Sequence, residues 1–87
     1  MGLILNKKLS ATGTQQTHTL GSSIRGISIY NDGADPILVD FDHIIDGDSR
    51  KIPSGNSLEL AQDFLVLYYK VASGSAATVY VTFIQNP

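Results

Sequence analysis

Residues 64–85 read FLVLYYKVASGSAATVYVTFIQ, and this stretch decides the fold class. It holds two runs, 64–72 and 77–85, rich in the β-branched and aromatic residues that fit a pleated sheet. Residues 73–76 between them are small, and so short a turn closes a hairpin. Strands joined by such a connection are antiparallel. The stretch therefore predicts an antiparallel β protein in which these two runs are hairpin partners.

The same pattern continues toward the N-terminus. The runs GISIYN (26–31), PILVDFD (36–42) and SLELA (57–61) are separated by NDGADP and by DGDSRKIPSGN, which are rich in turn-forming residues. Pro36 lacks an N–H, which suits the first residue of a strand. We expect a single all-β domain, a small antiparallel β-sandwich of jelly-roll or immunoglobulin-like type with about 6–8 strands.

Residues 1–23 differ from the rest in being rich in Thr, Ser, Gln and Gly. We expect them to form an extended N-terminal arm or edge strands, with the β-sandwich core in residues 24–87. Termini are commonly loose unless they are tied to a sheet, so a free arm and a docked strand both remain open.

The period of two assigns faces to the predicted strands. The core is predicted from three alternating sets: Ile27 and Ile29; Ile37, Val39 and Phe41; Val79, Val81 and Phe83. The run 64–71 is apolar on both faces: Phe64, Val66 and Tyr68 share one, and Leu65, Leu67, Tyr69 and Val71 share the other. Either the arm or another subunit covers the second face of this run, or the run is a central strand whose outer residues show at the surface.

Composition excludes several function classes. The 87 residues carry a net charge of −2 with six Lys and Arg, which argues against nucleic-acid binding, and there is no cysteine. The apolar start MGLIL is too short for a signal peptide or a membrane span. No nucleophile elbow and no convincing catalytic constellation occurs. We expect neither an enzyme nor a bound cofactor.

The acidic segment 40–48 is the candidate for metal binding. Asp40, Asp42, Asp46 and Asp48 are close in sequence, and the DGD at 46–48 is similar to calcium loops. The EF-hand pattern with its closing Glu is absent, and His18 and His43 stand isolated. We expect a solvated acidic loop without a metal, with calcium as the alternative.

Three tyrosines, Tyr30, Tyr68 and Tyr80, fall on outward positions. They form the apolar centre of a protein interface or a stacking platform for sugars, and the absence of Trp favours the interface. Thr and Gln side chains near the N-terminus suit strand addition to a neighbouring sheet edge. The predicted partner-binding residues are Leu3, Leu5, Thr14, Gln15, Thr17, Thr19, Tyr30, Tyr68, Tyr80, Ile44 and Ile45.

The order of GISIYNDGADPILVDFD, IPSGNSLELA and FLVLYYKVASGSAATVYVTFI resembles a type of small virion protein of tailed bacteriophages. The start KKLSATGTQQTHTL is similar to the opening strand of that type, and FDHIIDGDSRK is an insertion relative to it. The resemblance implies a β-sandwich that decorates or cements a capsid, or sits in the neck, tail or baseplate. The insertion would then contact a specific neighbour.

The predicted function is therefore a non-enzymatic capsid decoration subunit, located in the virion. It would bind other copies of itself and a major capsid or tail protein, with no nucleic-acid or membrane partner. The alternatives are a neck, tail or baseplate accessory protein, and a carbohydrate-binding module for host surface glycans.

Overall fold

The computed structural model describes residues 4–72 and 76–85 and confirms an all-β antiparallel fold. The strands are β1 (Ile4–Thr12), β2 (Gln16–Asn31), β3 (Ile37–Phe41), β4 (Arg50–Ile52), β5 (Ser57–Leu60), β6 (Phe64–Val71) and β7 (Ala76–Gln85). No helix in these ranges is long and apolar enough to cross a membrane.

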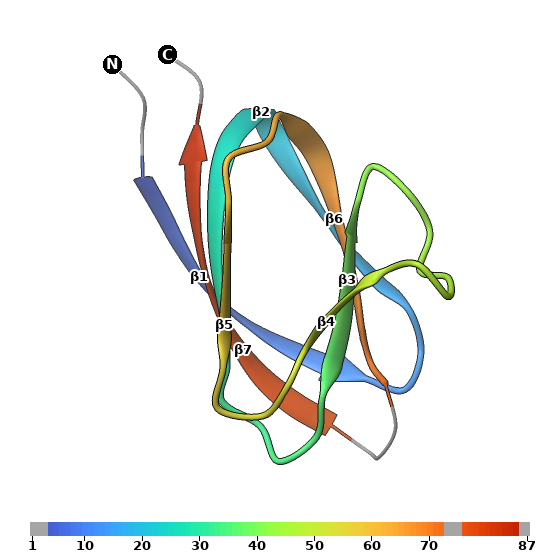
Figure 1. Ribbon diagram of the computed structural model, residues 1–87. Coiled ribbons are helices and arrows are strands. Elements are labelled where there is room, and N and C mark those ends of the chain that lie inside the picture. The colour runs from blue at the N-terminus through green and yellow to red at the C-terminus, as the bar shows by residue number, and fades with distance from the viewer. Residues whose placement is uncertain (1–3, 73–75, 86–87) are drawn as a thin grey trace.

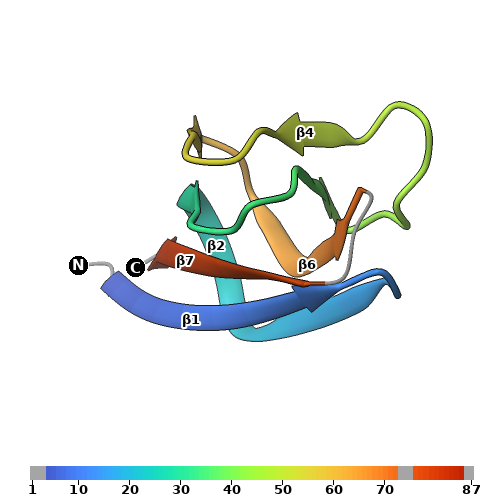
Figure 2. The ribbon, with the colours of Figure 1, turned by 90° about the horizontal axis from the view of Figure 1, so that it is seen from below.

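The strands form two layers that share β2 (Figures 1 and 2). The hydrogen-bonded order is β1-β7-β2-β6-β3-β4, and β5 also pairs with β2. The first half of β2, from Gln16, pairs with β6, whereas its second half, up to Asn31, pairs with β7 and β5. The registers of β2 with β6 and with β7 shift close to Ile24, where β2 passes from one layer to the other. We call the layers β1-β7-β2-β5 and β2-β6-β3-β4.

The core fills the space between the layers, and the predicted inward faces are confirmed. The three alternating sets of aliphatic and aromatic residues are all buried: Ile27, Ile29, Ile37, Val39, Phe41, Val79, Val81 and Phe83. Phe64 lies between two of these, with its ring centroid 4.9 Å from Phe41 and 6.4 Å from Phe83. Burial of such apolar surface is the main favourable term in folding.

The extended N-terminal arm is not confirmed. β1 pairs with β7 along its whole length, from Ile4 opposite Ile84 to Thr12 opposite Ala76. Ala11 is buried, and Leu5 and Leu9 pack against the core. Of the two alternatives, the docked edge strand is the one that the structure contains.

The predicted hairpin between the last two long runs is wrong. β6 and β7 do not pair, because β2 lies between them in the strand order. Short loops allow a hairpin but equally allow the chain to cross from one layer to the other. Among the described strands, only β3 and β4 are consecutive in the chain and also hydrogen-bonded to each other. All other strand pairs join segments that are separated by at least one other strand in the sequence.

The predicted facing of β6 is wrong at its first residues. Phe64 is buried and Leu65 is 48% exposed, so Phe64 does not share the outer face of Val66 and Tyr68. The alternation breaks because one carboxylate oxygen of Asp42, Oδ1, accepts hydrogen bonds from the N–H groups of both Leu65 (3.0 Å) and Val66 (2.8 Å). Asp42 has a φ of 55° and directly follows β3. Beyond this point β6 is a central strand between β2 and β3, and its outer residues Val66 and Tyr68 are half-buried.

Asn31 is the buried polar residue of the described core. Its side-chain Nδ2 donates to the carbonyls of Asp35 (2.8 Å) and Ile52 (3.0 Å), and its Oδ1 accepts from the N–H of Gly33 (2.9 Å). Its backbone N–H donates to Asn56. One side chain therefore joins the end of β2, the following turn and the end of β4.

Candidate functional site

The outer face of the β1-β7-β2-β5 layer gathers exposed apolar side chains. Tyr30 and Tyr80 are direct cross-strand partners and are 41% and 44% exposed. Ile4, at the start of β1, is 66% exposed and lies opposite Ile84. Alternation aims these residues outward because their chain neighbours fill the core. This face therefore contains two of the three tyrosines predicted for an interface, side by side.

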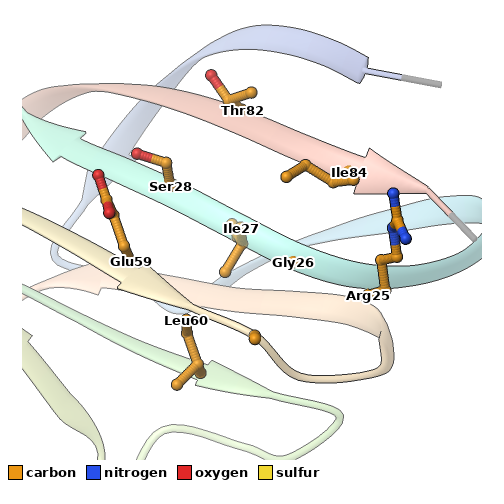
Figure 3. Close-up of a pocket in the computed structure, with 9 residues that line it drawn as sticks. Arg25, Gly26, Ile27, Ser28, Glu59, Leu60, Thr82 and Ile84 are labelled. Atoms are coloured by element: carbon orange, nitrogen blue, oxygen red, sulfur yellow. The ribbon is translucent and has the colours of Figure 1, made fainter. Parts of the chain in front are cut away.

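A groove with a volume of about 670 Å³ lies on the same face, across β7, β2 and β5 (Figure 3). Ser28 lies opposite both Thr82 and Glu59, and these three form a polar row. The next row toward the end of β7 is apolar, with Gly26 opposite Ile84. The groove is deep at this point because Gly26 has no side chain. A Cβ atom on Gly26 would lie 3.5 Å from Cδ1 of Ile84.

The groove has a charged group toward each end. Arg25 lies at the register shift between Ile24 and Gly26, beyond the apolar row, and Glu59 belongs to the polar row. Figure 3 shows the two side chains far apart, with Gly26 between them along β2. Both residues are exposed, and within residues 4–72 and 76–85 neither forms an ion pair.

A smaller hollow of about 420 Å³ adjoins the groove on the side of β1. Asn6, Lys8, Tyr80 and Thr82 line it, together with neighbouring backbone. The hydroxyl of Thr82 donates to Oδ1 of Asn6 at 2.8 Å, so Thr82 borders both hollows.

His18 is the imidazole that lies at the interior between the layers. His18 points toward it from β2 and stacks on Phe83, with ring centroids 5.6 Å apart. Burial, and secondly the nearby Lys7 ammonium, lower the pKa of His18 below its usual value of 6.5. In the part of the chain that the structure describes, His18 does not belong to a group of three possible metal ligands.

The acidic loop does bring three possible ligands together. One ligand atom each from Asp40, His43 and Asp46 lies within 4.8 Å of the others. Nδ1 of His43 is 3.6 Å from Asp40 Oδ2 and 3.8 Å from Asp46 Oδ2, and it also contacts the carbonyl of Ile44 at 2.6 Å. The sequence prediction missed His43 in this group, although the spacing of three residues on either side was visible.

Two other carboxylates of the acidic segment lie outside that group. Asp42 is used by the backbone of β6, as described above, and Asp48 does not belong to the three converging ligands. The similarity of the DGD at 46–48 to a calcium loop therefore does not extend to the arrangement of the carboxylates.

The other predicted partner-binding residues are dispersed. Leu3 lies outside the described residues, and Leu5 packs on the core. Thr17 and Thr19 are exposed on the half of β2 that pairs with β6. Tyr68 is half-buried on β6, opposite Thr17 and Asp40, so it does not join the other two tyrosines.

Two of the predicted residues meet where a turn contacts the acidic loop. Oε1 of Gln15 accepts a hydrogen bond from the N–H of Ile45 at 2.8 Å. Thr14 is exposed beside Gln15, and Ile44 is 59% exposed beside Ile45. This contact joins the acidic loop to the turn that precedes β2.

Comparison with known proteins finds the fold but no family. No known family and no curated protein matches the chain. Solved structures match over almost the whole chain. An HTH-3 family transcriptional regulator from Vibrio cholerae has a TM-score of 0.60 at 14% identity, over 97% of this chain and 42% of that one. A protein from Neisseria meningitidis has a TM-score of 0.59 at 16% identity, over 98% of this chain and 84% of that one.

A third structure is the Cupin-2 domain of an XRE-family transcriptional regulator from Enterobacter cloacae. It has a TM-score of 0.58 at 16% identity and covers 97% of both chains. The chain thus spans less than half of the Vibrio regulator but the whole of an isolated domain. Identities this low establish a common fold alone.

These matches contradict the resemblance to tailed-phage virion proteins. Two of the three similar structures are named as a bacterial transcriptional regulator or a domain of one, and none of the three is named as a virion component. The predictions that rested on this resemblance are therefore wrong as well. These are the capsid decoration role, its alternatives and the virion location. The motifs behind the resemblance, such as GISIYNDGADPILVDFD, consist of turn residues and alternation. Antiparallel β domains of unrelated origin share those features, because both follow from sheet geometry.

Proposed function

We propose that the chain is a non-enzymatic binding domain of a regulatory type, which holds a small molecule in the groove across β2, β5 and β7. The observation that carries this proposal is the groove itself, which is hollowed by the absence of a side chain at Gly26. Ligand sites are usually concave, mostly apolar and furnished with a few polar groups. Ile84 supplies an apolar wall, and Ser28 and Thr82 supply hydroxyls.

The fold supports a regulatory use. Two of the similar structures are named as transcriptional regulators, and one of them is a separate domain of such a protein. The groove residues favour binding over catalysis, since a hydroxyl nucleophile needs an adjacent base that is itself oriented by a third group. Ser28 and Thr82 have the carboxylate of Glu59 nearby but no histidine among the groove residues.

The test is to fill the groove. In Gly26→Val, new methyl groups enter the groove, and the nearest atoms to the added Cβ lie at ordinary contact distances of 3.5 to 3.8 Å. A chemically diverse small-molecule library is screened by amide chemical-shift changes in the unmodified protein. We expect ligands that shift the signals of Gly26, Ser28 and Thr82, and we expect Gly26→Val to lose their binding.

Gly47→Val is the matched control, because nothing lies within 4 Å of a Cβ at this exposed loop position. It should bind the same compounds as the unmodified protein. A library without a single compound that shifts groove residues would refute the proposal, as would ligands that bind Gly26→Val unchanged.

A second candidate function is self-association through the same face. The adjacent, half-exposed Tyr30 and Tyr80 favour it, because tyrosine is enriched at the centres of protein interfaces. Sedimentation velocity would measure it. The double variant Tyr30→Thr, Tyr80→Thr should sediment as a monomer where the unmodified chain forms a dimer, with Tyr68→Thr on the other layer as control. A monomeric unmodified chain at high concentration would exclude this function.

A further inference from the structure

We propose that the ligand of the groove is a small zwitterion, a molecule with a carboxylate at one end, an ammonium group at the other and a short apolar chain between them. This inference rests on the proposed function and names the chemical class of its ligand.

The order of side chains along β2 carries the inference. Arg25 comes first, then the apolar row of Gly26 and Ile84, then the polar row with Ser28 and Glu59. A ligand lying along β2 therefore meets a cation, an apolar floor and an anion in turn. An anionic molecule alone would leave Glu59 unmatched, and a cationic one would leave Arg25 unmatched.

The spacing sets the length of the ligand. Arg25 and Ser28 are three residues apart on β2, and a regular strand advances about 3.3 Å per residue, so the charged rows are at most about 10 Å apart, because the register shift at Arg25 shortens the advance. Glu59 lies beside Ser28 on the neighbouring strand. Both charged side chains are long and can lean over the apolar row. A ligand with a linear spacer of about five methylene groups suits this distance, because the extended ligand is slightly shorter than the separation of the charged rows.

Each end of the groove has the chemistry that its part of the ligand needs. A guanidinium presents a planar fork of N–H donors that matches a carboxylate. The Glu59 carboxylate accepts from an ammonium, and the hydroxyls of Ser28 and Thr82 can also accept. In the described ranges of the chain, no ion pair occupies either Arg25 or Glu59. The two charges are therefore available to a bound molecule.

The experiment uses 6-aminohexanoate as the probe, with hexanoate and hexylamine as compounds that each keep one charge. Amide signals of the full chain are followed during titration with each compound. We expect 6-aminohexanoate to shift Gly26, Ser28 and Thr82, and to bind about three- to tenfold more tightly than either control, the ratio for one charge-assisted contact at a solvated site.

Variants separate the two ends of the groove. Arg25→Gln should weaken 6-aminohexanoate binding about three- to tenfold and leave hexylamine binding unchanged, because one charge-assisted contact is lost. Glu59→Gln should weaken it similarly and leave hexanoate binding unchanged. Arg50→Gln and Asp48→Asn, which remove equal charges outside the groove, should bind as the unmodified protein does.

The outcomes distinguish this inference from the proposed function. Equal binding of all three compounds, or unchanged binding by Arg25→Gln and Glu59→Gln, refutes the zwitterion. So does failure of 6-aminohexanoate when other library compounds still occupy the groove, a result that leaves the proposed function standing. Absence of any groove ligand refutes both.

Discussion

His18 is a polar residue placed against the core. Its ring stacks on Phe83, and burial together with Lys7 lowers its pKa in the folded chain. The unfolded chain, with a pKa near 6.5, then binds a proton more readily than the folded one. The contribution of His18 to stability is complete above the unfolded pKa and is lost as the pH falls below about 6.5 toward the folded pKa.

The prediction is a pH slope that depends on this side chain. Between pH 7.5 and 5.5 the unfolding free energy of the unmodified chain should fall more than that of His18→Gln, as measured by urea unfolding at a series of pH values. Lys7→Gln should raise the pKa of His18 in an NMR titration, since it removes a nearby positive charge. Parallel pH profiles of the unmodified chain and His18→Gln would contradict the assignment.

At the scale of elements, Asn31 joins strand ends that the sheet does not pair with one another. Asn31→Ala would leave the carbonyls of Asp35 and Ile52 without their donors and Gly33 without its acceptor. Unsatisfied buried groups are costly, so we expect a loss of about 2 to 3 kcal/mol in the free energy of urea unfolding.

Asn56→Ala is the control for this change, because the Asn56 amide is exposed and donates to Ser54 within one turn. It should cost about 0.5 kcal/mol or less, as surface substitutions usually do. If the two variants were equally stable, the network around Asn31 would not hold the strand ends together.

The elements also show what the sequence could predict. Alternation correctly placed Ile29, Val39 and Val81 in the core, because a side chain's face depends on its own strand. It could not identify neighbours, and the expected pairing of β6 with β7 failed because β2 enters between them. The burial of Phe64 depends on hydrogen bonds that the N–H groups of Leu65 and Val66 donate to a distant residue, Asp42, and no local pattern reveals these bonds.

For the candidate site too, the sequence predicts the face on which a residue lies but not its neighbours on the adjacent strands. Outward positions for Tyr30 and Tyr80 were predictable from alternation, and the structure adds that the two lie opposite each other. The groove was not predictable, because it exists only when Gly26 is opposite Ile84 and Ser28 is beside Glu59. A register shift of one residue would move every one of these side chains to the other face.

At the scale of the whole molecule, the topology predicts slow folding for so small a chain. Most strands pair with partners far along the sequence, and β1 pairs with the last strand. The chain between two such strands must form a closed loop before their stabilising contacts can form. β-sandwiches of this kind therefore refold in milliseconds to seconds, on the order of a thousandfold slower than helical bundles. Stopped-flow fluorescence of the tyrosines should show this, and refolding in microseconds would contradict it.

The pairing of β1 with β7 also brings the start of the first strand next to the end of the last described strand. Ile4, at the start of β1, is the cross-strand partner of Ile84, near the end of β7. A domain with neighbouring ends can be rejoined by a short linker and reopened at a surface loop, or placed inside a loop of another protein, with little strain on its host. The fold can therefore be carried within a larger chain, and the exposed position Gly47, where nothing lies within 4 Å of an added Cβ atom, is the natural place to reopen it.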